Sequence, residues 1–391
     1  MDFRPGARAN GASRFLADEA YATYPHCNGY YDHGRRLVVG RAGDGTPRLF
    51  GIAVDDPTDD APELLLDLGA LIGGAGTDVA AQDPPMGATA WFDVALDAQV
   101  LAAAWAERVV VRDLADAASV PAVVYVSPAD WSLDGLVSIS ADGARLIVNE
   151  TRGVVRRIVE VRLVDGAAHE LLRLDWWANH SHLCPADEDW IGFAHEGSAT
   201  TVHDRVWGWH PEHAPDGRAL VAQHEIVDAA AAGSPAASVA LGHERWMFHE
   251  PGAIVVAYGD SPVGPRGVHL VPVDGRPVRL LSAGDRDWHC GISRDGTHVV
   301  VDTTGPEGAP GRGWQDAGER SSIVLIDVAD GTRTVLDETS FEPHPFHPHP
   351  SFTPDGRGIV YNRVERDADG AVTRRGVAIV AVPTETAGDH R

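Results

Sequence analysis

The dipeptide Asp-Gly recurs along this chain and constrains its fold more than any other feature. It occurs ten times, at residues 44–45, 134–135, 142–143, 165–166, 216–217, 274–275, 295–296, 330–331, 355–356 and 369–370. Asp-Gly between two runs of alternating apolar residues predicts a tight hairpin turn, because both residues tolerate positive φ. Segments such as "VSISADGARLIVNE" and "PSFTPDGRGIVYNRV" have this form. We therefore expect a chain made mainly of short antiparallel strands.

The predicted hairpins alternate in kind, which indicates a repeat. An inner hairpin such as "HCGISRDGTHVVVDTT" is followed by an outer one such as "SIVLIDVADGTRTVLDE". Four strands over about 45–55 residues are typical of a β-propeller blade. Repeats begin near residues 24, 87, 136, 178, 243, 289 and 345. The sequence thus predicts an all-β, seven-bladed β-propeller with four-stranded antiparallel blades, as one domain over residues 1–391. A two-domain α/β fold would need long alternating helices, which are absent.

Three stretches depart from the repeat. The segment "LDAQVLAAAWAERVV", about residues 96–110, has the one convincing helical pattern, although a strand at its end fits equally well. Residues 55–87 are interpreted as an acidic insertion between the first two blades. Residues 226–242 are of low complexity and are expected to form a surface loop or a short helix.

Composition excludes several classes of partner. A net charge of −25 argues against nucleic acid, and an acidic ligand would need local arginine or metal to bind. No apolar run reaches the roughly 18 residues that span a bilayer, so no membrane partner is expected. The N-terminal residues lack a signal-peptide pattern, and the three cysteines lack CxxC spacing. We expect a cytoplasmic protein that acts on a small ligand, with the oligomeric state left open.

The turns also align the histidines. Six residues before Asp355, Asp295 and Asp32 stand His349, His289 and His26, and comparable places are held by His180, His182 and His243. The first strand of each propeller blade usually lines the central channel, so equivalent positions face one space. The histidines are therefore expected to converge although they are far apart in sequence.

Four of these histidines form a candidate metal site. His344, His347 and His349 lie within one short stretch, and His347 and His349, two apart on a strand, would share a face. Together with His289 they could supply four imidazole nitrogens to Mn, Fe, Ni or Zn. The alternative is a set of polar side chains that line a wet channel. Cys290 alternates to the opposite face, which favours buried packing.

Two further residues are candidates for substrate binding and acid–base catalysis. Arg205, just before the "VWGW" strand, could anchor a carboxylate through its guanidinium, or could form a structural ion pair with Glu196 or Asp204. His243 has no ligand partner two residues away, which leaves it free to act as an acid or base. Its alternative role is to line the channel. The chain has no P-loop, no GxSxG elbow and no HExxH motif.

The order "HSHLCPADEDWIGFAHEG", "HDRVW", "GHERW", "WHCGISRDG" and "HPHPSFTPDG" resembles the oligogalacturonate lyases, seven-bladed propellers of pectin degradation. The resemblance is most specific over residues 178–362 and weak over residues 55–130. It implies a Mn²⁺ site of three histidines and one glutamine, which match His289, His347 and His349, with His344 in the glutamine position. It also implies that His243 is the base, that Arg205 binds substrate, and that His180 is a channel-facing residue expected to contact substrate.

The resemblance implies β-elimination from a uronate in short oligogalacturonates such as unsaturated digalacturonate. A metal on the C6 carboxylate would stabilise the charge that develops as His243 takes the C5 proton. Two alternatives stay open. One is a lyase or isomerase for another acidic sugar, which the His344 departure keeps in view. The other is a non-catalytic TolB-like binding propeller, although such a protein has no reason to gather histidines at one channel mouth.

Overall fold

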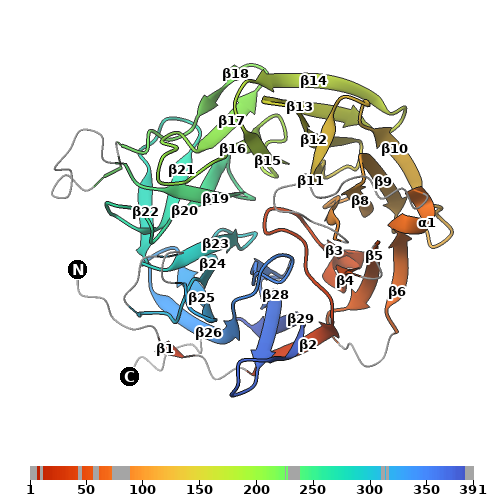
Figure 1. Cartoon of the computed structure of the whole chain (residues 1–391). Coiled ribbons are helices and arrows are strands. Elements are labelled where there is room, and N and C mark those ends of the chain that lie inside the picture. Colours follow the sequence, from red (N-terminus) through yellow and green to blue (C-terminus); the bar gives the residue numbers. More distant parts are fainter. Residues whose placement is uncertain are drawn as a thin grey trace.

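Seven small β-sheets surround a common axis (Figure 1). The computed structural model describes residues 7–8, 12–42, 46–55, 61–72, 89–224, 226–227, 238–309, 313 and 317–383. Consecutive strands pair antiparallel within each sheet, and the chain visits the sheets in sequence order. The prediction of an all-β, seven-bladed propeller with four-stranded blades is confirmed.

The strands of the seven blades follow one another as the repeats predicted. The first three blades contain β3 (Tyr30–Tyr31), β4 (Arg36–Ala42), β5 (Pro47–Ala53) and β6 (Glu63–Asp67); β7 (Trp91–Val94), β8 (Val100–Trp105), β9 (Arg108–Asp113) and β10 (Ala122–Val126); and β11 (Ser132–Ile139), β12 (Arg145–Arg152), β13 (Val155–Arg162) and β14 (Ala167–Leu174). The next two contain β15 (Ala178–Leu183), β16 (Ile191–His195), β17 (Val206–His210) and β18 (Ala214–Ala219); and β19 (Leu241–Trp246), β20 (Gly252–Ala257), β21 (Gly267–Pro272) and β22 (Arg279–Ala283). The last two contain β23 (Asp287–Ile292), β24 (His298–Thr303), β25 (Arg320–Asp327) and β26 (Arg333–Ser340); and β27 (Ser351–Phe352), β28 (Gly358–Arg366) and β29 (Val372–Ala381).

The N-terminal strands close the ring. The strand β2 (Arg14–Asp18) pairs antiparallel with β29 and becomes the fourth strand of the seventh blade. The short strand β1 (Ala7–Arg8) pairs parallel with β26 and extends the sixth sheet. Because hydrogen bonds join the first part of the chain to the last, the ring cannot open without breaking a sheet. The turn motifs gave no signal of this closure.

Three of the Asp-Gly turns share one local construction. The hydroxyl of Ser293 donates to the carboxylate of Asp295 over 2.7 Å, and Gly296 adopts a φ of 73°. The hydroxyl–carboxylate bond recurs at Ser140–Asp142 and Thr353–Asp355. Glycine adopts positive φ without steric cost, because it has no Cβ, and this is why the turn requires glycine at that position. Seven of the ten dipeptides join two strands of one blade in this structure: those at residues 142, 165, 274, 295, 330, 355 and 369.

Two Asp-Gly pairs were wrongly interpreted as hairpin turns. Asp134-Gly135 lies inside β11, where the register with β12 shifts and Gly135 has a φ of 88°. Asp216-Gly217 lies inside β18. Glycine within a strand accommodates a bulge as readily as a turn, so the dipeptide alone does not separate the two. The pair at residues 44–45 lies outside the described residues.

The helical prediction for residues 96–110 is wrong. This segment contains β8 and the start of β9, which are joined by a turn at Ala106 and Glu107 with φ values of 47° and 63°. Three consecutive alanines, residues 102–104, are at most 2% exposed because neighbouring blades cover both faces of β8. A strand buried on both faces shows no polar alternation, and its sequence therefore imitates a buried helix.

The structure describes part of the first predicted insertion and little of the second. Residues 55–87 are not wholly an insertion, because residues 63–67 form β6, the outer strand of the first blade. A short helix, α1 (Leu68–Ile72), follows it. Residues 73–88, and most of the segment 226–242, lie outside the described residues. A second short helix among the described residues is η1 (Asp32–Gly34), which precedes β4.

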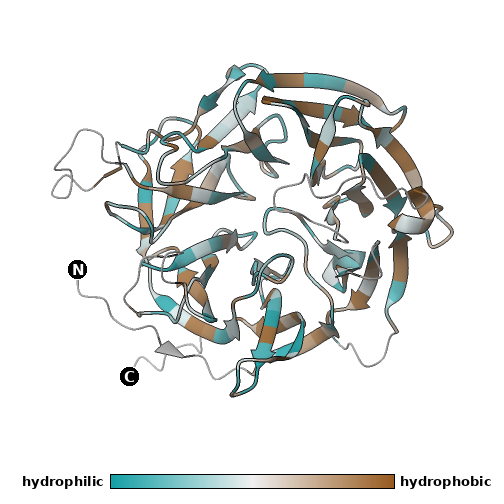
Figure 2. Cartoon of the chain, viewed as in Figure 1, coloured by the Kyte–Doolittle hydropathy of each residue, from teal (hydrophilic) through white to brown (hydrophobic). Residues whose placement is uncertain are grey.

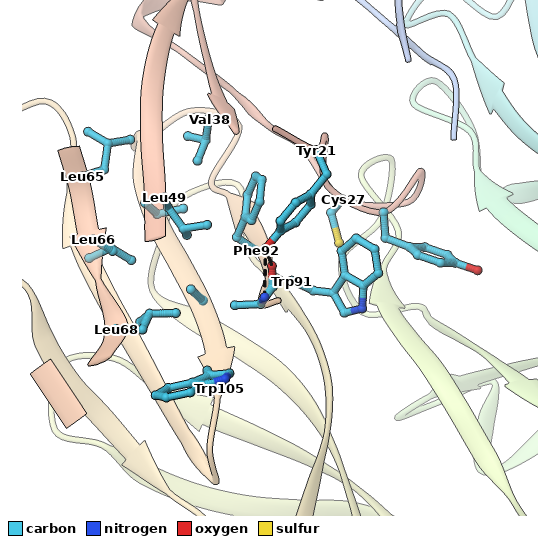
Figure 3. Packing of buried hydrophobic residues seen from close by; sticks show 14 of the residues in the cluster. Tyr21, Cys27, Val38, Leu49, Leu65, Leu66, Leu68, Trp91, Phe92 and Trp105 are labelled. Atoms are coloured by element: carbon cyan, nitrogen blue, oxygen red, sulfur yellow. Dashed lines mark hydrogen bonds between the residues drawn. The ribbon is translucent and has the colours of Figure 1, made fainter. Parts of the chain in front are cut away.

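Apolar residues from neighbouring blades form the core. Figure 2 shows them along the blade strands, whereas the connections are mostly hydrophilic. The cluster between the first two blades is drawn in Figure 3 and includes Leu49, Leu66 and Phe92. The hydroxyl of Tyr21 donates to Ala90 O and accepts from Ala90 N, each over 2.9 Å, and so ties the segment after β2 to the second blade. Among the described residues, no helix is long and apolar enough to cross a membrane.

Candidate metal centre and its surroundings

Three innermost strands carry histidines where their pairing is irregular. The register of β15 with β16 shifts between Asn179 and His182, and that of β19 with β20 shifts between Gly242 and Arg245. The register of β23 with β24 shifts by one residue between Asp287 and Cys290, around His289. His180 and His243 lie in these bulges, with φ values of 61° and 51°. A bulge inserts one extra residue and redirects the side chain. A non-glycine residue at positive φ costs on the order of 1 kcal/mol or more, so the surrounding structure must hold each histidine in place.

His289 of β23 and the segment before β27 bring the predicted metal ligands together. One ring nitrogen from each of His289, His347 and His349 lies within 4.8 Å of the others. The ring of His344 lies beside them, with its centroid 4.0 Å from that of His347 and 5.1 Å from that of His349. The four predicted residues therefore converge from two blades. Their role as ligands stays a prediction.

The prediction that His347 and His349 lie on one strand and share a face is wrong, although their rings are neighbours. These residues precede β27, which begins at Ser351, and His349 has a φ of 45°. Asn362, a fully buried residue of β28, shapes the segment instead. Its side-chain amide donates to His347 O over 2.8 Å and to Pro345 O over 3.0 Å, and its own N–H donates to Pro348 O over 2.8 Å.

Asp302 organises the cluster from behind. Its carboxylate accepts hydrogen bonds from the backbone N–H and the Nδ1–H of His289, both over 2.7 Å, and from the backbone N–H of His349 over 3.2 Å. Asp302 lies on β24 opposite the irregular part of β23 and is fully buried. Sequence reasoning missed it. The sequence does place a carboxylate at the end of the apolar run "VVVD". Burying a carboxylate is costly unless it has a hydrogen-bond or ionic partner, so this position could have indicated one.

The chemistry of the donor set suits a transition metal. Nε2 of His289 and both ring nitrogens of His349 are buried and have no hydrogen-bond partner among the described residues. Burial, assisted by the neighbouring imidazoles, lowers the pKa of His349 far below its usual value and that of His344 to about 3. The rings of His349 and His344 are therefore neutral at pH 7, which is the form that binds metal. A divalent ion would satisfy nitrogens that otherwise stay unpaired.

His243 lies at the edge of this cluster. Its ring centroid is 4.1 Å from that of His289, and its Nδ1 is 3.0 Å from the hydroxyl oxygen of Tyr24. Burial and the nearby His289 lower the pKa of His243 well below its usual value, so the ring is neutral at pH 7. The thiol of Cys290 donates to the carbonyl of His243 over 2.9 Å and is itself buried, as the strand alternation predicted.

Arg205 lies next to an acidic partner. Its guanidinium donates to Glu196 Oε2 over 2.6 Å and to Gly197 O over 2.9 Å, so the alternative of an ion pair with Glu196 is realised. Nδ1 of His180 lies 3.6 Å from the other oxygen of Glu196. Burial acts to raise the pKa of Glu196, but the charges of His180 and Arg205 outweigh it and hold that pKa below its usual value. Asp204, the second proposed partner of Arg205, pairs with His195 over 2.8 Å.

His26 and His182 form a separate pair. Their rings stack with centroids 4.4 Å apart and planes 13° from parallel. Nδ1 of His182 is hydrogen-bonded to His180 O over 2.7 Å, and Arg245 donates to His26 O over 2.6 Å. The turn register gave His26 a place equivalent to those of His289 and His349, whereas the group formed by His289, His347 and His349 does not include it.

Glu244, next to His243, is a second acid that sequence reasoning missed. It is 5% exposed, and neither carboxyl oxygen has a hydrogen-bond partner among the described residues. Burial, with Glu196 nearby, raises its pKa to about 8, so the carboxyl is protonated at neutral pH. No motif distinguishes this residue from an ordinary strand glutamate.

The fold and the histidine cluster together define a seven-bladed β-propeller with a candidate metal centre formed by the inner strand β23 and the segment before β27. The chain is 26% identical over 226 residues to an oligogalacturonide lyase of Pectobacterium atrosepticum, an alignment that covers 55% of this chain and 53% of the relative. It is also 26% identical over 228 residues to an oligogalacturonate lyase of Dickeya dadantii, with the same coverage. The match spans about half the length of these curated relatives. These alignments confirm the resemblance that the sequence motifs indicated.

A solved structure carries the same fold over nearly the whole chain. An oligogalacturonate lyase in complex with manganese superposes with a TM-score of 0.71 at 19% identity, covering 97% of this chain and 99% of that one. At this identity the likeness establishes the propeller architecture. No protein-family model matches the chain.

Proposed function

We propose that this protein is a divalent-metal-dependent lyase that cleaves short oligogalacturonates by β-elimination. The observation that carries the proposal is the convergence of His289, His347 and His349, with His289 oriented by a buried carboxylate. The alignments to oligogalacturonate lyases support the substrate class. A cytoplasmic location would suit a substrate that is already short.

His289, His347 and His349, with His344 beside them, would hold the metal. Manganese is the first candidate, because it is the ion in the similar solved structure. When bound, the ion acts as a Lewis acid on the uronate carboxylate and makes the neighbouring C5 proton more acidic. Asp302 keeps the proton of His289 on Nδ1, which directs the Nε2 lone pair towards the ligand position.

Arg205 would bind a uronate carboxylate. Its guanidinium is held in place by Glu196 and Gly197, and its Nε is buried without a partner among the described residues. A fixed guanidinium provides charge without reorganisation when the substrate enters. His180, which faces Glu196, would contact the same part of the substrate.

His243 would act as the general base. Its neutral imidazole accepts the C5 proton, the C5–H electron pair forms the C4–C5 double bond, and the C4–O bond breaks. A water molecule protonates the leaving oxygen, which departs as a hydroxyl, and the resulting hydroxide takes the proton back from His243. The depressed pKa of His243 keeps the ring neutral at pH 7, although burial also lowers its basicity. Arg205 stabilises the enolate-like negative charge that develops on the substrate, and this stabilisation offsets part of the loss in basicity of His243.

The test is an elimination assay with a panel of uronate disaccharides in which the conjugated, unsaturated uronate is followed by ultraviolet absorbance. Metal-free protein is prepared by chelation and reconstituted with Mn²⁺. We expect absorbance to rise with digalacturonate and only in the reconstituted protein. Turnover of a different uronate alone would identify another acidic sugar as the substrate. Absence of both metal binding and elimination would favour a non-catalytic propeller.

A further inference from the structure

The segment between β2 and β3 reaches the histidine cluster from the N-terminal part of the chain. Figure 1 shows it running from the seventh blade to the centre of the ring before it enters the first blade. The segment is anchored on both sides: the Tyr21 hydroxyl bonds to Ala90, the Thr23 hydroxyl donates to Phe92 O, and the backbone N–H of Ala22 donates to the side chain of Asn362 over 2.8 Å. These bonds fix the position of Tyr24, the next residue.

The Tyr24 ring is buried among imidazoles. Its centroid lies 4.9 Å from that of His349, 5.1 Å from that of His180 and 6.3 Å from that of His243. Trp91 packs edge-on against it at 5.6 Å. The side chain is 6% exposed, so its hydroxyl is held in one place. The sequence separates Tyr24 from His243 by 219 residues, and only the closed ring brings them together.

The hydrogen bond between Tyr24 and His243 has two chemically different directions. A phenol either donates to an imidazole nitrogen or accepts from it. If Tyr24 donates to Nδ1, a neutral His243 carries its proton on Nε2 and has no lone pair left for a substrate proton. If Tyr24 accepts from Nδ1–H, the Nε2 lone pair is free. The direction of this 3.0 Å bond therefore decides whether His243 can act as a base.

We propose that Tyr24 is a positioning residue, whose hydroxyl oxygen accepts the Nδ1 proton of His243 and thereby presents the Nε2 lone pair to the substrate. This inference rests on the proposed role of His243 as the base. Among the described residues, His243 is the one polar side chain bonded to this hydroxyl, so the hydroxyl's own proton stays available to a substrate oxygen. The arrangement parallels catalytic triads, where a third group selects the tautomer of the histidine.

Two observations argue against other roles for Tyr24. Burial raises the pKa of its hydroxyl well above the usual value, so the group is not an ionised base at neutral pH. A role confined to packing would not require the hydroxyl. The neighbouring Tyr21 provides the contrast, because its hydroxyl bonds to the backbone of Ala90 and reaches none of the histidines through a hydrogen bond in the described residues.

The first experiment reads the tautomer without any substrate. Protein labelled with ¹⁵N-histidine and free of paramagnetic metal is examined by nuclear magnetic resonance, and a His243→Asn variant assigns the His243 signals. We expect the Nδ1–H tautomer in the wild type and a mixture of both tautomers in Tyr24→Phe. A wild-type ring with its proton on Nε2, or a tautomer unchanged by Tyr24→Phe, would overturn the proposal.

The second experiment compares Tyr24→Phe with Tyr125→Phe, which removes a buried hydroxyl bonded to Glu150 between the second and third blades, in the elimination assay with Mn²⁺-loaded protein. We expect Tyr24→Phe to lower kcat about 10- to 100-fold, with KM and metal content little changed, because a partner that orients a functional histidine has effects of this size. Tyr125→Phe should lower thermal stability while leaving kcat near that of the wild type. Equal kcat values for the wild type and a folded Tyr24→Phe protein would contradict the inference. If no uronate is eliminated by the wild type, the proposed function fails while the tautomer measurement still tests the Tyr24–His243 bond.

Discussion

Nδ1 of His289 lies 2.7 Å from Oδ2 of Asp302, and this contact links the innermost strand of the sixth blade to its neighbour. Both side chains are buried, and the same carboxylate also holds the backbone of His349. One acidic residue therefore fixes a ring orientation in one blade and a chain position in the next. Carboxylates in this relationship to metal-binding histidines raise ligand basicity and fix the tautomer.

Asp302→Asn should weaken metal binding about 10- to 100-fold, because the neutral amide no longer holds the Nδ1 proton of His289 as strongly. Calorimetric titration of metal-free protein with Mn²⁺ measures the change. The matched control is Asp330→Asn, at the exposed turn between β25 and β26, which should leave the affinity unaltered. An unchanged affinity in a folded Asp302→Asn protein would remove Asp302 from the metal centre.

His344→Gln replaces the histidine by the residue found in the glutamine position of the family motif. Because His344 lies beside the three-histidine group rather than within it, we expect this variant to retain metal, whereas His289→Ala should lose it. Metal content after gel filtration distinguishes the two. Loss of metal in His344→Gln would make this ring an essential ligand.

His243→Asn should abolish most turnover and leave metal content intact. Asparagine tolerates the positive φ of 51° at this position better than alanine does, so the bulge in β19 is preserved. General-base catalysis contributes about 10²- to 10⁴-fold, and kcat should fall within that range. The measurement is steady-state elimination alongside metal analysis. Wild-type turnover in this variant would show that another group takes the proton.

Arg205→Lys keeps the positive charge but removes the fork-shaped donor set. We expect KM for digalacturonate to rise about tenfold or more, because an ammonium group cannot serve Glu196, Gly197 and a substrate carboxylate together. Lysine is preferred to alanine here, since leaving Glu196 buried and unpaired would cost about 3–5 kcal/mol of stability. If KM does not move, Arg205 serves only the ion pair with Glu196.

Stability should fall in acid through the buried His26–His182 pair. Burial, opposed by the hydrogen bond to His180 O, lowers the pKa of His182 to about 3, and burial also lowers that of His26. The unfolded chain therefore binds more protons below the ordinary histidine pKa of about 6.5, and stability is lost as pH falls from there towards 3. His182 alone should cost about 2 kcal/mol of stability at pH 5 relative to pH 8.

The control for this prediction is His182→Gln, which removes one titrating ring. The difference in unfolding free energy between wild type and variant, measured by urea denaturation at several pH values, isolates the contribution of His182. A difference that stays constant from pH 8 to pH 5 would mean that His182 does not stay neutral in the folded protein.

Local turn chemistry made much of the fold predictable. A Ser or Thr two residues before the Asp of Asp-Gly donates a hydrogen bond to that Asp and stabilises the turn. The motifs "SRDG" and "TPDG" therefore predict hairpins. The register from Asp295 and Asp355 also equated His289 with His349. Where the same dipeptide lay inside β11, the prediction was wrong, because glycine serves a bulge as well as a turn. The helical prediction for the alanine run of β8 was also wrong, because full burial removes the apolar–polar alternation that marks a strand.

The sequence by itself determined the strand hairpins, the seven repeats and the set of histidines that stand at equivalent places. Only the tertiary structure decided which of them form the metal-compatible group, because that depends on a one-residue bulge, on Asp302 and on Asn362. It also decided that Tyr24 meets His243, since β2 must join the seventh blade before the segment after it can reach the centre of the ring. Turns are encoded by the φ preferences of adjacent residues, whereas these contacts join residues distant in sequence, whose distances are set only when the ring closes.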